Sequence, residues 1–437
     1  MSVDTHSSST RFGPTAIAAR MGVHYGWVVV GATFLLILIA TGVRATPGVL
    51  IKPLEDDFGW SRGDISWALS LSLLTLGLAG PVSGIMLERI GLRKTVLTFL
   101  GVVAMGTAAA TTMEQLWQFH VYWGVLVGFG SGGVSIVLAA AIANTWFEER
   151  RGLVTGLLGS AASAGQFIFL RILLQLVDAR GWQWAVGFMS LLLLTIAVPL
   201  ALLLLRNRPT DAGVDVYGGN SGAGVAIADT RVTGMRTALR TFDFWLLALS
   251  FGICGFTTVG LIGTHFIPHA TEHGFTANQA AGVLTVMGLF NIAGTIGSGW
   301  LTDRYSPRRL LAFYYFLRAI SLLALPLMTN MSLMTGFAVV FGADYIATVP
   351  PTIMLTAERF GRRSVGTIYG WISFTHMAGA ALAATIAGQI HDATGDYAMA
   401  IYLSGVLGVL AAAMAFNIGG KARREKEEKS KLEPVPA

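Results

Sequence analysis

Long apolar stretches recur along the chain, and they constrain its fold more than any other feature. A helix needs roughly 20 apolar residues to cross a hydrocarbon layer about 30 Å thick. Only 12% of the residues are charged, against about 25% in ordinary soluble domains. The sequence therefore predicts an all-α membrane protein. Its twelve expected spans are 26–48, 64–86, 95–112, 118–144, 152–176, 184–205, 242–267, 278–300, 309–329, 332–356, 364–388 and 398–419.

A short charged loop occurs twice, each time between two apolar stretches. Residues 84–94 read GIMLERIGLRK, and residues 299–309 read GWLTDRYSPRR. In both loops glycine allows close helix packing, and an acid beside basic residues can cap a helix or pair with arginine. Such a repeat in two halves of an apolar chain is typical of an internally duplicated transporter. The candidate gating residues of the two loops are Gly84, Glu88, Arg89, Gly91, Arg93, Gly299, Asp303, Arg304 and Arg308.

These loops resemble the signature of the major facilitator superfamily, which lies between the second and third and between the eighth and ninth helices. Glu88 stands where the family usually has Asp, and Ser306 where it usually has Gly. The resemblance implies twelve transmembrane helices in two six-helix bundles. It also implies a secondary transporter whose bundles rock about a central site and expose it alternately to each side.

Composition and charge divide the chain into five parts and orient it. Residues 1–24 are polar and lack the apolar core of a signal peptide, and the one long interior loop is rich in Gly and Asp. With the N-terminus inside, 24 of the 30 Lys and Arg residues are cytoplasmic, 3 are external and 3 lie within spans, which satisfies the positive-inside rule. The expected parts are a cytoplasmic segment 1–24, an N-terminal bundle 25–205, a cytoplasmic linker 206–241, a C-terminal bundle 242–419 and a cytoplasmic tail 420–437.

Five ionisable side chains fall inside the expected spans and away from the span ends: Arg44, Arg171, Arg318, Asp344 and His376. Charged groups at the centre of a membrane helix cost about 2.5–3.5 kcal/mol on insertion scales, so they are functional candidates by default. Three arginines against one aspartate leave an excess of fixed positive charge, which an anion would neutralise. Because the guanidinium fork suits a carboxylate, the sequence favours a small organic anion as substrate.

Each of these residues also has a purely structural interpretation. Arg318 and Asp344 lie at similar depth on consecutive antiparallel spans and could form an ion pair that only stabilises the fold. Arg44 and Arg171 could extend along their long stems to the outer interface. His376 could be a packing residue among small neighbours, and the prolines of ATVPPT at 347–352 could form either a packing kink or a gating hinge.

Three further stretches resemble the branch of the family that contains monocarboxylate porters and oxalate/formate antiporters. They are YGW at 25–27, FGWSRGDIS at 58–66 and WFEERRGLVTGLLGSAASAG at 146–165. The porters' characteristic Asp and Arg of the eighth helix are absent, because 285–300 offers only Asn291 as a strong polar group. A relative's substrate is therefore not transferred to this chain.

The resulting prediction is a proton-coupled symporter for a monocarboxylate-like anion, functional as a monomer in the plasma membrane, such as a bacterial inner membrane. Arg44 and Arg171 would hold the carboxylate, Asn291, Tyr345 and His376 are the further candidate substrate-binding residues, and Asp344 with Arg318 would carry the coupling proton. The alternatives are a carboxylate exchanger that moves no proton, and a drug or sugar transporter of the same fold.

Other classes of protein are disfavoured. No nucleophile, metal cluster or pair of acids gathers at one depth, which argues against an enzyme. The GFGSGG of 128–133 formally fits a dinucleotide-binding pattern, but it lies inside an apolar span with no preceding strand, so close helix packing explains it and no cofactor is expected. The net charge of +6 is spread over alternating loops, so nucleic acid is not expected as a partner.

Overall fold

A computed structural model of the protein describes residues 22–219 and 233–420. Most of the predicted N-terminal segment, part of the interior loop and nearly all of the tail lie outside these residues. Within them the chain is helical, and extended pairing is confined to one isolated bridge between Phe147 and Tyr217. The predicted all-α membrane fold is confirmed.

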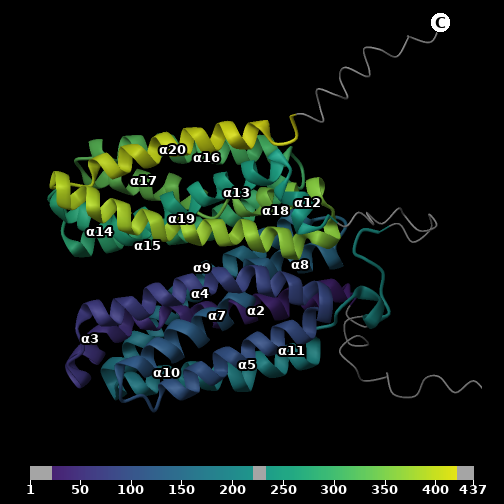
Figure 1. Ribbon diagram of the computed structural model, residues 1–437, viewed down its shortest axis with the longest axis horizontal. Helices are drawn as coiled ribbons and strands as arrows, with labels where there is room; N and C mark the ends of the chain where they lie inside the picture. The colour runs from purple at the N-terminus through teal and green to yellow at the C-terminus, as the bar shows by residue number, and fades with distance from the viewer. Residues whose placement is uncertain (1–21, 220–232, 421–437) are drawn as a thin grey trace, which may run out of the picture. The chain divides into compact units, whose positions relative to one another are not determined.

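Contacts divide the described residues into two compact units. The first holds the helices up to residue 219 together with Val365–Gly370. Its core contains large fully buried aromatic side chains, among them Trp123 and Trp146. The elements of this unit, seen in Figure 1, are α2 Tyr25–Ala45, α3 Pro47–Phe58, α4 Arg62–Ile90, α5 Leu92–Ala110, α6 Leu116–Phe119, η1 His120–Val127, α7 Gly128–Gly133, α8 Ile136–Trp146, α9 Arg151–Arg180, α10 Trp182–Leu192, η2 Leu193–Ala197, α11 Val198–Leu204 and η3 Pro209–Ala212.

The second unit holds the described residues from 233 onward, apart from Val365–Gly370. Within it α16 packs beside α20, and α15 beside α17 (Figure 1). Its elements are α12 Met235–Leu239, α13 Phe242–Gly255, η4 Phe256–Ile262, α14 Gly263–Glu272, α15 Ala277–Thr302, α16 Pro307–Ala324, η5 Leu325–Leu327, α17 Met331–Asp344, α18 Val349–Phe360, η6 Arg362–Ser364, α19 Val365–Thr394 and α20 Ala398–Asn417.

Eleven helical segments among the described residues are long and apolar enough to cross a membrane. Together with α19 they match the twelve predicted stretches one for one. The 30-residue helix α19 is not one of the eleven, because threonines, glycines and His376 dilute its apolar residues. Length and apolar composition alone therefore identify eleven of the twelve expected spans.

The predicted first span, 26–48, is too long. Helix α2 ends at Ala45, and a separate helix, α3, begins at Pro47. Proline has no backbone N–H to continue a helix but fits well at the first position of a new one. The predicted spans 118–144, 184–205 and 242–267 are likewise interrupted, by the π-helical turns η1, η2 and η4.

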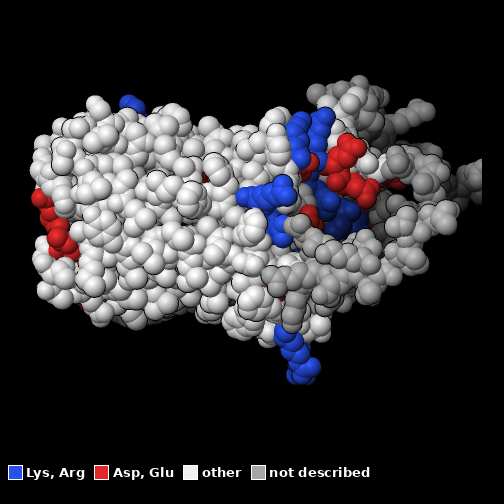
Figure 2. Space-filling view, turned by 90° about the horizontal axis from the view of Figure 1, so that it is seen from above, with Lys and Arg blue, Asp and Glu red and all other residues white. Residues whose placement is uncertain are grey.

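The surface is suited to lipid contact. Figure 2 shows a broad band of uncharged side chains, with charged side chains gathered toward its ends and most Lys and Arg at one of them. Large apolar side chains are exposed in both units, such as Leu203 (61% exposed) and Phe242 (69%). Apolar exposure on this scale marks a surface that contacts something other than water.

Candidate functional site

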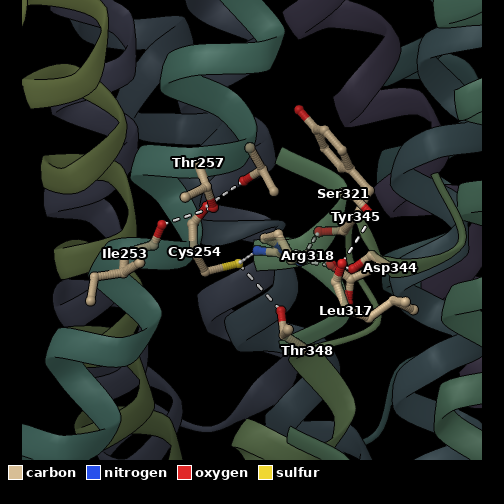
Figure 3. A network of polar contacts seen from close by, with 10 residues as sticks. Ile253, Cys254, Thr257, Leu317, Arg318, Ser321, Asp344, Tyr345 and Thr348 are labelled. Carbon is tan, nitrogen blue, oxygen red and sulfur yellow. Dashed lines mark hydrogen bonds and ion pairs between the residues drawn. The ribbon is translucent and has the colours of Figure 1, made fainter. Parts of the chain in front are cut away.

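The deepest polar cluster of the second unit is centred on Arg318 of α16. Its side chain is fully buried, and so is that of Asp344 at the end of α17, which is 1% exposed. Arg318 Nε donates to Asp344 Oδ2 at 2.6 Å (Figure 3). A buried guanidinium needs such a partner, because removing a charge from water costs several kcal/mol that only paired and hydrogen-bonded geometry offsets. The ion pair that the sequence suggested is present.

The same guanidinium also donates to backbone carbonyls where α17 ends. Helix α17 stops at Asp344, and α18 begins at Val349 with Pro350 and Pro351 in its first turn. Arg318 Nη2 donates to the carbonyl oxygens of Asp344, at 2.8 Å, and Tyr345, at 3.2 Å. Arg318 of α16 therefore holds the end of α17 at the point where the helix breaks.

A third carbonyl of the break is held from α15. Pro351 has no N–H to offer the Ala347 carbonyl, which lies four residues earlier. Ser298 Oγ donates to that oxygen at 2.5 Å. The link between α17 and α18 is therefore held by side chains of two neighbouring helices.

Cys254, near the end of α13, completes the cluster. Arg318 Nη1 donates to Cys254 Sγ at 2.8 Å, and the Thr348 hydroxyl lies 3.3 Å from the same sulfur (Figure 3). The ring of His376, on α19, lies 4.7 Å from that of Phe251, one turn before Cys254. Groups from α13, α16 and α17 thus meet around Arg318.

The predicted hydrogen-bonding residues take different positions in the second unit. Tyr345 follows Asp344 directly and gives its carbonyl to Arg318, and His376 is half-buried beside Phe251. Asn291 of α15 is buried, and its Oδ1 accepts from the Thr295 hydroxyl at 3.0 Å. Tyr345 and His376 therefore adjoin the Arg318 cluster, and the bond from Thr295 to Asn291 joins residues one turn apart in α15.

Arg44 and Arg171 lie in the first unit, on α2 and α9. These helices run side by side, and a Cβ on Gly42 would lie 2.3 Å from the ring of Phe169, while one on Gly165 would lie 2.4 Å from the Leu38 carbonyl. Arg44 follows Gly42 by two residues, and Arg171 follows Phe169 by two residues. The two arginines therefore lie at the same level along the pair of helices. Both side chains are exposed on the unit, and neither forms an ion pair with a carboxylate of the described residues.

The first charged loop makes specific contacts. Glu88 Oε1 accepts from the backbone N–H of Thr367, which belongs to the same unit, at 2.9 Å. Gly91 has φ +84°, a conformation that other residues rarely adopt. Arg93 Nη2 donates to the Leu202 carbonyl at 2.6 Å, next to the end of α11. Gly84 lies against Gly366 without room for a Cβ, and Arg89 is exposed.

In the second loop the basic residues rest on aromatic rings. The guanidinium of Arg304 lies 3.8 Å from the Trp300 ring centroid, and that of Arg308 lies 5.3 Å from the Phe416 ring. Asp303 is exposed just after α15, and its N–H reaches the carbonyl of the buried Gly299 at 3.4 Å. In this loop two arginines thus pack against aromatic side chains.

Sequence reasoning missed Cys254, Thr348 and Ser298 as members of the cluster. Cys254 lies 64 residues from Arg318 in the chain, and nothing in an apolar helix indicates which side chain faces a distant partner. One signal was present in the sequence, the glycine next to Cys254. In the structure a Cβ on Gly255 would lie 1.8 Å from the His376 carbonyl oxygen, so only glycine fits there. A glycine beside a cysteine in a span can mark such a close helix crossing.

A multi-pass helical protein with charged side chains buried among its apolar helices has the features expected of a membrane transport protein. The family model of the Major Facilitator Superfamily matches residues 33–384 and, in a second match, residues 266–437. The chain belongs to this superfamily of secondary transporters.

Relatives are distant but extend over most of the chain. An uncharacterized MFS-type transporter, YcxA of Bacillus subtilis, is 24% identical over 86% of this chain and 90% of its own length. Monocarboxylate transporter 12-B of Danio rerio is 23% identical over 94% and 91%. A solved double-tryptophan mutant of XylE superposes with a TM-score of 0.73 at 15% identity, covering 90% of this chain and 96% of that one, which shows the fold alone.

Proposed function

We propose that the protein carries a small organic anion, most simply a monocarboxylate, together with a proton. The observation that carries this proposal is the pairing of Arg318 with Asp344. That pair uses the one acid expected deep within the spans and leaves Arg44 and Arg171 without a carboxylate partner among the described residues. Two uncompensated guanidinium groups within spans favour an anionic ligand.

Each candidate residue has a proposed role. Arg44 and Arg171 bind the carboxylate, and Asn291, Tyr345 and His376 are the further candidate substrate-binding residues. Asp344, held by Arg318, takes up and releases the coupling proton. The acids and arginines of the two charged loops brace the helix ends during the conformational change. The similarity to a monocarboxylate transporter supports the substrate class, and exchange without a proton is the alternative.

Binding of a monocarboxylate tests the substrate class. Purified protein is screened by thermal shift against small monocarboxylates, neutral sugars and lipophilic cations, and we expect the acids alone to stabilise it. Arg44→Gln and Arg171→Gln should each weaken binding about 10-fold or more, because a hydrogen bond to a charged group contributes about 1.5–3 kcal/mol. Arg180→Gln, at the end of the same helix α9, is the matched control. Stabilisation by a sugar, or unchanged affinity in both variants, would contradict the assignment.

We also propose that the protein lies in the plasma membrane with both termini and the interior loop cytoplasmic. A cysteine introduced at Thr210 or at Ala393, both exposed, tests this in intact cells with an impermeant maleimide. The Ala393→Cys protein should be labelled, and the Thr210→Cys protein should be labelled only after the cells are opened. The unmodified chain is the control, because Cys254 is buried. The opposite pattern would invert the proposed orientation.

A further inference from the structure

The buried thiol of Cys254 belongs to the Arg318 cluster. Proton coupling through Asp344 alone gives it no role. Its sulfur is the acceptor of the 2.8 Å bond from Arg318 Nη1, and both side chains are almost completely buried, at 1% and 0% exposure. A guanidinium removed from water requires strong acceptors for its N–H groups. A thiolate satisfies this requirement far better than a neutral thiol, so the sulfur competes with the carboxylate as counter-ion.

Asp344 gives an independent indication. Its Oδ2 binds Arg318 Nε, but its Oδ1 is buried and accepts no hydrogen bond in the part of the chain that the structure describes. A buried ionised carboxylate with one bare oxygen is poorly compensated. The site therefore has one cation and two acids, and the carboxylate is not fully satisfied as an anion.

The charge of the cluster depends on how many protons the two acids hold. With both ionised, the group formed with Arg318 carries a net charge of −1, and with both protonated it carries +1. Either state leaves an uncompensated charge in a low-dielectric interior, which is strongly unfavourable. With one proton between the two acids the cluster is neutral.

We propose that Cys254 and Asp344 share one proton around Arg318, so that the thiol is a second proton-holding group of the coupling site. In one form the proton is on Sγ, and the Asp344 carboxylate neutralises Arg318. In the other form the proton is on Asp344 Oδ1, and the thiolate neutralises Arg318. The two forms contain the same atoms and carry the same net charge. This inference rests on the proposed proton-coupled transport and deepens it.

Other titratable groups face this cluster from the surrounding helices. The ring of Tyr315, on α16, lies 5.7 Å from the guanidinium carbon of Arg318, and Tyr345 follows Asp344. His376, on α19, is partly exposed, and its ring lies 4.7 Å from that of Phe251, one turn before Cys254 in α13. We assign it as the group through which a proton reaches the buried thiol.

The S–H stretching band in the infrared tests the inference without a transport assay. The chain has one cysteine, so the band reports Cys254 alone. At neutral pH we expect Asp344→Asn to lose the band, because the thiolate becomes the only counter-ion of Arg318. The double variant Arg318→Leu with Asp344→Asn should show the full band, since no cation is then present to hold a thiolate. A full band in Asp344→Asn would overturn the inference.

Transport provides a second test that does not depend on the stability of Asp344→Asn. Cys254→Ser keeps a hydrogen-bonding group of similar size that cannot ionise in this range. We expect the ratio of proton-driven uptake to substrate exchange to fall at least 10-fold in proteoliposomes. Ile253→Val, at the adjacent position in α13, is the control and should keep the ratio of the unmodified protein.

The outcomes separate the two proposals. Exchange without proton-driven uptake in the unmodified protein would refute the proposed proton coupling, whatever Cys254 does. Proton coupling in the unmodified protein with an equal ratio in Cys254→Ser would refute only the shared proton.

Discussion

Arg318→Leu is expected to yield little folded transporter. The substitution leaves Asp344 as a buried anion without its cation and removes the donor to the Asp344 and Tyr345 carbonyls. Removing one partner of a buried ion pair typically costs about 3–5 kcal/mol, a large part of the stability of most proteins. The measurements are the yield of monodisperse protein in detergent and the unfolding midpoint. Arg309→Leu, exposed on the same helix α16, should change stability by no more than about 0.5 kcal/mol.

The double variant Arg318→Leu with Asp344→Asn separates structure from function. It leaves no unpaired charge at this site, so folding should recover in large part, while proton-driven uptake should remain absent. If uptake recovered together with folding, the pair would serve only the fold, and the coupling role would be wrong. A single Arg318→Leu variant as stable as Arg309→Leu would contradict the energetic argument itself.

Gly294→Val is expected to destabilise the second unit nearly as strongly. A Cβ on Gly294 in α15 would lie 1.9 Å from the Ala343 carbonyl oxygen in α17, and one on Gly342 would lie 2.3 Å from the Met287 carbonyl. The obstructing atoms are backbone, so relief requires the helices to separate. Overpacking typically lowers the free energy of unfolding by about 1–3 kcal/mol and occasionally more. We expect a cost near the upper end of this range, because the backbone cannot move aside as a side chain can. The unfolding midpoint measures the loss.

The control for this prediction lies three residues along the same helix. A Cβ on Gly297 would meet no atom within 4 Å, so Gly297→Ala should keep or slightly raise stability, because alanine favours a helix by up to about 1 kcal/mol over glycine. Gly294→Ala and Gly297→Ala make the same chemical change. If the two variants unfold at the same midpoint, the close approach of α15 and α17 is not what glycine provides at position 294.

The sequence predicted those parts of the structure that depend on local order. The length of the apolar runs predicted the spans. The similar depth of Arg318 and Asp344 in consecutive antiparallel spans suggested their ion pair. It did not predict α3, because the apolar run continues across the point where Pro47 starts a new helix. Nor did it predict that Cys254 joins Arg318. Helices that are apolar on all sides carry no stripe to show which face meets which neighbour.

The bond between Arg318 and Asp344 also bears on how the chain enters the membrane. A ribosome completes α16 before α17, so Arg318 leaves the exit tunnel 26 residues ahead of its carboxylate. Alone, α16 would insert with an arginine that costs about 2.5–3.5 kcal/mol at the helix centre. We therefore expect α16 to wait at the translocon until α17 emerges, so that the two helices move into lipid as a hairpin with the arginine already neutralised.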